Sequence, residues 1–292
     1  MFKTIINAWK IADLRKKMLF TALIVFIFRL GAALPVPFVN ISGGLISDQN
    51  ANNFMTYLSM MTGDAFNYGT LFAMSITPYI NASIIIELLT VAIPALERLA
   101  KEGEEGRKKI STITRYSSVV LALMQSTAYY FYIRSQNYLS LDADGNKITG
   151  FFAVLQAITI IFCYTAGASL IMWLGEQINE KGIGNGISII LFAGIVSRMP
   201  TTLYSLYSYM DKGGAYYALA PIAFVSLILM IGFIVWMDNA ERRIPVQYAK
   251  RVVGRKMYGG QSTHIPIKVN MCGVLPIIFA SSILSLPPTI QM

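Results

Sequence analysis

Apolar residues along the chain fall into seven blocks, separated by polar or charged connections. Each block holds about 20 residues, which as an α-helix is long enough to cross a hydrocarbon core of about 30 Å. Several blocks contain Gly, Ser or Thr, small residues that let neighbouring membrane helices approach closely. The pattern predicts an all-α integral membrane bundle with spans at 18–37, 71–93, 110–133, 152–174, 186–204, 218–237 and 271–290.

The composition agrees with a membrane protein. The chain has 292 residues, of which 55% are hydrophobic and 13% are charged, whereas soluble domains carry roughly 25% charged residues. Basic residues before the first span resemble the start of a secretory signal peptide. A small-residue cleavage site is missing, however, and the apolar stretch is long for a signal peptide, so we expect a retained span.

Lys and Arg fall mainly on one side of the membrane if each of the seven spans crosses it in the direction opposite to the span before. The amino-terminal tail and the second, fourth and sixth connections hold nineteen Lys and Arg, and the opposite side holds four: Arg134, Lys147, Arg198 and Lys212. Lys and Arg accumulate on the cytoplasmic side of membrane proteins. We therefore expect the tail and the basic connections to lie in the cytoplasm, and part of the net charge of +9 serves this orientation.

The sixth connection, residues 238–270, is larger than topology requires. Ile244, Val246 and Tyr248 alternate with other residues, as do Ile265 and Ile267 later in the loop, and this period of two predicts extended arms. Gly254-Arg255-Lys256 lies between the arms. The loop is therefore predicted to project a basic tip into the cytoplasm, either to dock a partner or merely as a solvated loop that sets orientation.

The connection after the first span includes an amphipathic stretch at 54–61 that is too short to cross a membrane. It fits an interfacial helix or a segment that folds back between spans. Re-entrant backbone is tolerated only where protein or a water-filled cavity surrounds it. Periodicity alone leaves the two alternatives open.

Candidate chemistry is sparse. Cys163 and Cys272 lie in or beside predicted spans and His264 has no metal-binding neighbour in the sequence, so we expect neither a disulfide nor a metal site. The run at 101–109 lacks the pattern of a phosphate-binding loop. The glycine-rich run at 182–186 lacks the preceding strand of a dinucleotide-binding motif, and we interpret it as a tight turn into the fifth span. No cofactor and no enzymatic activity are expected.

Arg29 and Glu87 are the two charges that lie clearly inside predicted spans, away from their ends. Charges are costly in lipid and are often functional there, yet structural pairing is the favoured interpretation for both. Glu87 would hydrogen-bond a neighbouring span or face a cavity, and Arg29 would pair with backbone carbonyls near the outer end of the first span. By spacing alone, Ile76 with Ile80 and Ile187 with Leu191 are ordinary packing pairs.

Several runs together resemble the SecY family, the pore-forming subunits of bacterial protein-conducting channels. They include LGEQI at 174–178 with GIGNGIS at 182–188, and KEGE at 101–104 with RKKI at 107–110 and TRY at 114–116. The sixth connection adds YAKR at 248–251, QSTH at 261–264 and KVNM at 268–271. The similarity runs from the first span to residue 292 in the expected topological order.

The resemblance gives some of these residues a role. It implies a ring of aliphatic side chains at the narrowest point of an hourglass pore. An extended chain can pass through this ring, whereas an ion would lose its hydration there without compensation. The matching positions are Ile76, Ile80, Ile187, Leu191 and Ile278. It also implies a plug segment at about 54–67 that blocks the outer funnel of the idle channel and favours re-entrance over an interfacial helix. The matching plug residues are Tyr57, Leu58, Met60, Met61, Gly63 and Phe66.

The resemblance also implies partners. The sixth connection of the family docks on the ribosome or on the SecA ATPase, and the second and seventh spans flank a lateral gate for signal sequences. Other implied partners are SecE, SecG, nascent chains and membrane lipids. Glu87 stands where the family has an uncharged residue, which puts a gating role for it in doubt. The implied docking residues are Arg242, Arg243, Lys250, Arg251, Arg255, Lys256, Arg107 and Lys108.

Family members have ten spans in two inverted five-span halves. The resemblance therefore implies a SecY-like repeat that is incomplete after the seventh span, with residues 1–204 as the first half and 205–292 as the start of the second. We expect a Sec channel subunit of the bacterial cytoplasmic membrane that passes unfolded secretory chains and inserts membrane proteins. Two alternatives stay open, namely a truncated non-conducting form that binds translocon partners and a polytopic solute transporter.

Overall fold

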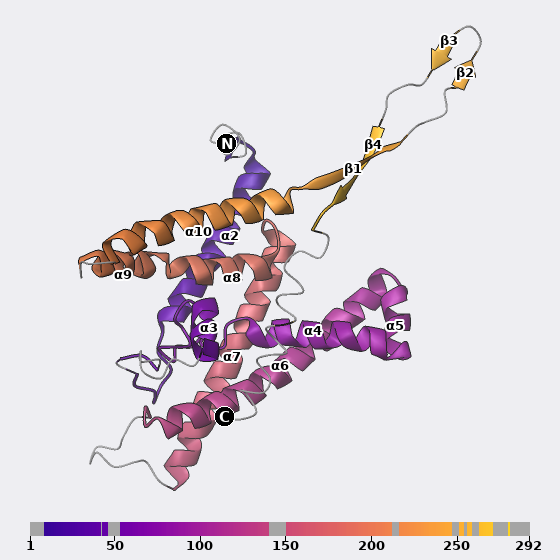
Figure 1. Ribbon diagram of the computed structural model, residues 1–292. Helices are drawn as coiled ribbons and strands as arrows, with labels where there is room; N and C mark the ends of the chain where they lie inside the picture. Colours follow the sequence, from indigo (N-terminus) through magenta and orange to yellow (C-terminus); the bar gives the residue numbers. More distant parts are fainter. Residues whose placement is uncertain are drawn as a thin grey trace. The chain divides into compact units, whose positions relative to one another are not determined.

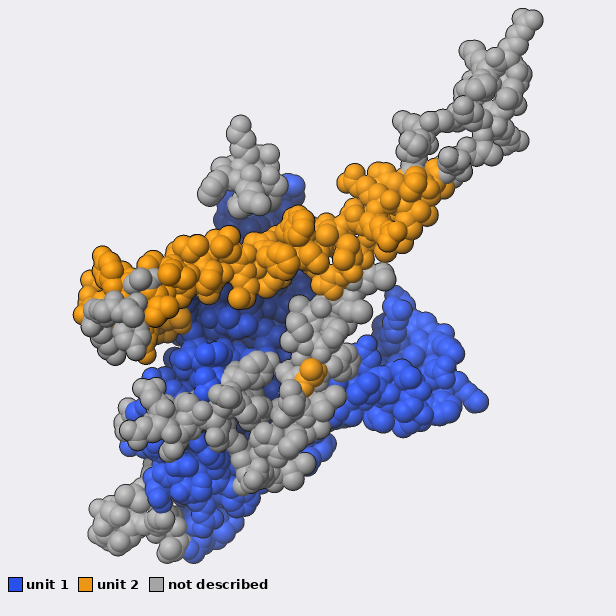
Figure 2. Space-filling view, viewed as in Figure 1, with its two compact units in different colours: residues 1–200, 282–292 blue, residues 201–281 orange. Residues whose placement is uncertain are grey.

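The computed structural model describes residues 9–41, 43–45, 53–139, 150–211, 216–246, 251–253, 256–258, 263–270 and 280. The chain divides into two compact units, residues 1–200 with 282–292 and residues 201–281 (Figure 2). Each unit is described by itself. The first unit is helical, and the second combines a long helix with β-ribbons (Figure 1).

Helices dominate the described residues. Their bounds are α2 (Ala12–Ala33), α3 (Asn53–Thr62), α4 (Thr77–Ala92), α5 (Pro94–Lys101), α6 (Glu104–Ser135), α7 (Phe151–Lys181), α8 (Gly186–Ser197), α9 (Met199–Asp211) and α10 (Tyr216–Asp238). Helices lie in six of the seven predicted spans, and the seventh, 271–290, falls outside the described residues apart from Ala280. The prediction of helices at those six positions is therefore confirmed.

Three helical stretches of the described residues are long and apolar enough to cross a membrane: Phe151–Lys181, Gly186–Asp211 and Pro221–Asp238. A fourth qualifies if α4 and α5, which are bent by 101° at Ile93, are taken as one span. The helices α2 and α6 are long but begin among charged residues, and α2 also carries Arg29. Because of these charged and polar residues, neither α2 nor α6 is counted among the helices that are apolar enough to cross a membrane.

Prolines set several helix ends that differ from the predicted span limits. The helix α2 ends at Ala33, because Leu34 precedes Pro35 and takes the extended conformation that a residue before proline prefers. Ile93 before Pro94 is extended for the same reason and separates α4 from α5. The second span was predicted from residue 71, but α4 begins at Thr77 with Pro78 in its first turn, where proline is tolerated.

The stretch before α4 is not helical although it is deeply buried. We call residues 65–76 the return segment. It leads from the end of α3 back to α4 and packs against α2, α6 and α7, with its Ala73 and Ile76 at most 1% exposed. A Cβ atom at Gly167 of α7 would lie 2.2 Å from the carbonyl oxygen of Leu71. Only a glycine lets α7 come this close to the return segment.

Buried hydrogen bonds hold the return segment in place. The hydroxyl of Tyr129 in α6 donates to the carbonyl oxygen of Phe66, and the hydroxyl of Tyr164 in α7 donates to that of Gly69 at 3.0 Å. The two tyrosine rings also meet each other edge to face, 5.1 Å apart. The backbone N–H of Leu71 donates to Leu34 after α2. Non-helical backbone at membrane depth needs such partners, since lipid offers none.

The predicted tight turn at 182–186 is confirmed. Gly184 has a φ of +74°, a conformation that glycine adopts without strain. Asn185 caps α8, and its side chain accepts hydrogen bonds from the backbone N–H groups of Ile187 and Ser188. The turn therefore fixes where α8 begins, directly after α7.

The second unit contains the two predicted extended arms. Strands β1 (Glu241–Val246) and β4 (Thr263–Lys268) pair antiparallel, with Ile244 opposite Ile265. Strands β2 (Arg251–Val253) and β3 (Lys256–Tyr258) form a separate two-stranded sheet nearer the middle of the loop. The prediction of two arms across the basic loop is confirmed, whereas the tip residues 254 and 255 lie outside the described residues.

Replacement of Tyr129 by Phe tests the anchoring of the return segment. The change removes the tyrosine donor to the buried carbonyl of Phe66, which keeps the backbone N–H of Gly69 at 3.3 Å. It should lower the free energy of unfolding by about 1 kcal/mol. Thermal denaturation in detergent would show a lower midpoint. Tyr116, 73% exposed on the same helix, provides the control, since Tyr116→Phe should melt like the wild type. Equal midpoints for both variants would contradict the anchoring.

Candidate functional site

The short helix α3 packs against the carboxyl-terminal end of α8. Ser59 and Thr62 of α3 are at most 2% exposed. A Cβ atom added to Gly194 of α8 would lie 2.8 Å from the carbonyl oxygen of Met61, and one added to Gly63 would lie 2.7 Å from the carbonyl oxygen of Gly194. Two glycines thus allow the end of α3 to lie directly on α8.

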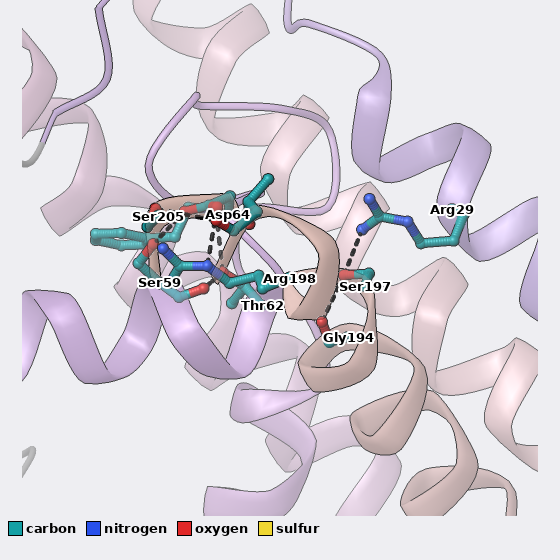
Figure 3. Close-up of polar contacts among 10 residues, drawn as sticks. Arg29, Ser59, Thr62, Asp64, Gly194, Ser197, Arg198 and Ser205 are labelled. Atoms are coloured by element: carbon teal, nitrogen blue, oxygen red, sulfur yellow. Dashed lines mark hydrogen bonds and ion pairs between the residues drawn. The ribbon is translucent and has the colours of Figure 1, made fainter. Parts of the chain in front are cut away.

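Polar side chains surround this contact (Figure 3). Arg198, directly after α8, forms an ion pair with Asp64, with 2.9 Å between its Nε and the Oδ2 of the carboxylate. Asp64 also accepts a hydrogen bond of 2.9 Å from the hydroxyl of Ser59. Arg29 of α2 donates to the hydroxyl of Ser197 at 3.0 Å, and that hydroxyl donates to the carbonyl oxygen of Gly194. Both arginines therefore lie at the junction of α3 and α8.

An aliphatic cluster fills the space between α4, α7 and α8. Ile76, at the amino-terminal end of α4, is 1% exposed, and Ile187 of α8 is half-buried. Side-chain atoms of both lie within 3.8 Å of the position that a Cβ atom on Gly175 of α7 would take. Ile80 and Leu191 are half-buried and pack against the same cluster. The structure thus gathers four of the five predicted pore-ring residues in one cluster, and Ile278 lies outside the described residues.

The predicted plug residues fall into two groups. Tyr57, Leu58, Met60 and Met61 belong to α3, where Met60 is exposed and Met61 is half-buried. Gly63 and Phe66 follow the helix, and the Phe66 ring packs on Tyr129, with ring centroids 4.7 Å apart. The predicted segment at 54–67 therefore spans a short helix and the start of the anchored return segment.

Most of the predicted docking residues lie in described parts of the chain, and two of them do not. Arg107 and Lys108 are exposed in the first turns of α6, and Arg242 and Arg243 are exposed on β1. Arg251 begins β2 and Lys256 begins β3, whereas Lys250 and Arg255 lie outside the described residues. Arg107, Lys108, Arg242 and Arg243 form no ion pair with any described residue.

The charges predicted inside spans behave differently from each other. Within the part of the chain that the structure describes, Arg29 bonds to the Ser197 hydroxyl, which α8 brings within reach, and to no backbone carbonyl. Glu87 is exposed on α4, and its side chain makes no hydrogen bond to the described residues. A further ion pair joins Arg115 of α6 to Glu176 of α7, with 2.6 Å between Nε and Oε1.

Sequence reasoning missed Asp64, Ser197, Tyr129 and Tyr164 and treated Arg198 only as a loop charge. One signal was available, since Asp64 is the only carboxylate in the long connection after residue 48 and before α4. The long-range hydrogen-bond and ion-pair partners of these residues are 63 to 168 positions away in the sequence, so no local pattern pairs them. Among the described residues, no three His, Cys, Asp or Glu side chains gather into a group that would hold a metal ion.

Comparisons with known proteins agree on one family. The family model described as SecY matches residues 70–292. The protein translocase subunit SecY of Streptomyces scabiei is 43% identical over 290 residues, which cover 98% of this chain and 66% of that protein. The chain thus spans slightly less than two thirds of the length of this relative.

Solved structures of low sequence identity share the fold. One is described as "The structure of a protein conducting channel"; it has a TM-score of 0.62 and 19% identity, over 93% of this chain and 56% of that one. Another, also with a TM-score of 0.62 and with 16% identity over 94% of this chain and 57% of that one, concerns the plug domain of SecY, which stabilises the closed state of its channel and maintains a membrane seal. The fold, the family model and the close relative together show that this multi-pass membrane chain belongs to the SecY family of protein translocase subunits.

Proposed function

We propose that this chain forms the central part of a Sec channel that passes unfolded secretory proteins across a membrane and releases hydrophobic segments into it. The observation that carries the proposal is the path of residues 53–76, which we interpret as re-entrant. A short helix and a buried non-helical return segment lie inside the helical bundle, next to a cluster of aliphatic side chains. A lone membrane anchor or a bundle that only packs has no use for such a path, whereas a closed channel needs a removable obstruction.

The aliphatic cluster suits the narrow point of such a channel. Ile76, Ile80, Ile187 and Leu191 offer flexible apolar surfaces without hydrogen-bonding groups, so a moving extended chain finds no fixed partner. Ions would lose their hydration there without compensation. Opening would turn the half-buried faces of Ile80, Ile187 and Leu191 towards the chain, and Ile278 would complete the ring from the seventh predicted span.

The basic loop 238–270 is proposed as the cytoplasmic docking site for the ribosome or the SecA ATPase. An isolated two-stranded ribbon is marginally stable in water, and Ile244 and Ile265 are 41% and 55% exposed on β1 and β4. A partner that covers these apolar side chains and meets the basic residues would stabilise the ribbon. Arg107 and Lys108 would contribute further positive charge from the start of α6.

The distribution of Lys and Arg supports a cytoplasmic amino terminus in a bacterial cytoplasmic membrane. Partner subunits SecE and SecG, signal sequences and lipids complete the proposed assembly. Energy for transport would come from the SecA ATPase or from the ribosome.

A stalled secretory chain should crosslink to the proposed pore. We expect crosslinks in the assembled channel from a photoreactive side chain at Ile80 or Leu191, because a chain in transit must pass the aliphatic ring. The same probe at Phe162, 58% exposed on α7, should not crosslink to it, since that face would meet lipid. Equal yields at all three positions, or crosslinks only from Phe162, would reject the pore.

Charge reversal in the loop tests the docking site. Arg251→Glu with Arg255→Glu should weaken ribosome or SecA binding roughly tenfold at low salt, and less at high salt, because screening already weakens the attraction there. Binding is measured on membrane vesicles that contain the whole channel. The control Lys147→Glu lies in a loop predicted on the opposite side and should leave binding unchanged. Unchanged binding of the double variant at low salt would assign the docking to another surface.

A further inference from the structure

The two parts of the re-entrant path are attached by different forces. The return segment is fixed by buried tyrosine hydroxyls and by aromatic packing from α6 and α7. At the end of α3, the described contacts include a glycine-to-backbone approach on α8, the polar contacts around Asp64, and a hydrogen bond of 3.1 Å from the backbone N–H of Phe66 to the hydroxyl oxygen of Thr62. Removing the return segment would strip several buried groups of their partners, whereas moving α3 breaks contacts that water can replace.

Two consecutive residues with positive φ angles lie between the two parts. Gly63 and Asp64 are consecutive and have φ angles of +65° and +70°. Both are therefore left-handed, a conformation that Gly and Asp tolerate better than most residues. Small changes of φ and ψ at these two positions would swing α3 while residues 65–76 stay in place.

Asp64 joins the hinge to both of its neighbours. Its carboxylate accepts from Ser59 in the last turns of α3 and from Arg198 after α8, so a single side chain ties helix, hinge and bundle together. The Asp64 and Arg198 side chains are 23% and 29% exposed, which leaves them open to water when the pair separates. Arg29 supports the same junction, because its guanidinium bonds to Ser197 and lies 3.2 Å from the Cβ position of Gly63.

We propose that Asp64 and Arg198 are positioning residues that latch α3 in the closed state, and that α3 opens about Gly63 and Asp64 while the return segment remains anchored. This inference rests on the proposed channel function. It divides the predicted plug into a moving helix and a fixed base. The ion pair then sets how readily the idle channel opens.

The test uses the whole protein in its native membrane, with Cys163 and Cys272 replaced by Ser. A single cysteine is introduced at Thr62 on α3 or at Ala65 in the return segment, both of which are at most 2% exposed. Labelling by a membrane-impermeant maleimide then reports how often each position becomes accessible. The measurement needs no secretory substrate, so it is independent of the transport assay.

Asp64→Asn keeps the side-chain shape and tolerates the positive φ, but it removes the charge. With this change or with Arg198→Gln, the cysteine at position 62 should be labelled roughly ten- to hundredfold faster, the range expected for loss of a hydrogen-bonded charged pair. The double variant should be labelled no faster than the single ones, since both break the same contact. Arg198→Lys keeps the charge and should restore most of the protection.

The cysteine at position 65 distinguishes a hinge from general unfolding. Its labelling should stay slow in every variant, because the return segment does not move. Glu176→Gln removes another ion pair that involves neither α3 nor α8, and it should leave labelling at position 62 unchanged. Unchanged labelling at position 62 in Asp64→Asn, or an equal rise at positions 62 and 65, would overturn the latch.

A steric variant provides a second route to the same state. Gly194→Ala would push on the Met61 carbonyl oxygen without touching any charge and should also speed labelling at position 62. The control Gly232→Ala lies in helix α10, where an added Cβ atom meets nothing within 4 Å. Ion conductance of the idle channel in a planar bilayer should rise in the same variants.

The labelling and crosslinking experiments together separate the two proposals. If labelling responds while a stalled chain gives no crosslinks at Ile80 or Leu191, the proposed channel function fails and the latch is only a structural contact. If the crosslinks form while labelling does not respond, the latch alone is rejected.

Discussion

The rest of the structure depends on one constraint, which is that the non-helical backbone of the return segment must find its hydrogen-bond partners inside the protein. Lipid supplies no such partners, and each peptide group left without a hydrogen bond there would destabilise the fold by several kcal/mol. Tyr129 and Tyr164 reach across from α6 and α7 to meet two of these carbonyls. This requirement fixes the spacing of α6 and α7 around the return segment.

Close backbone approaches follow from the same constraint. Gly167 admits the Leu71 carbonyl to the surface of α7, and Gly194 admits the Met61 carbonyl to the surface of α8. Larger side chains at either position would separate the return segment or α3 from the bundle. The short helix, the return segment and the aliphatic cluster therefore form one connected arrangement in the first unit, which is what a channel with a removable obstruction requires.

The division between apolar anchoring and polar latching has a physical logic. Buried aromatic contacts and the buried hydrogen bonds from Tyr129 and Tyr164 resist displacement, because water cannot take their place without entering the core. An ion pair that is about a quarter exposed, such as Asp64 with Arg198, exchanges protein partners for water at lower cost. A moving part attached by polar contacts to a base attached by apolar ones can open and close without loss of the fold.

Most of the helices, the turn at 182–186 and the two arms of the basic loop could be predicted from the sequence alone, because they depend on local periodicity and on neighbours a few residues apart. The short runs of sequence that resemble SecY also identified the channel family, and they indicated Ile76, Ile80, Ile187 and Leu191 as residues of the pore ring. The tertiary structure decided what holds them, since Tyr129 and Phe66 are 63 residues apart and Arg29 and Ser197 are 168 apart. Such pairs leave no periodic signal, and whether an isolated Asp is a solvated charge or a latch depends on which helix the fold brings beside it.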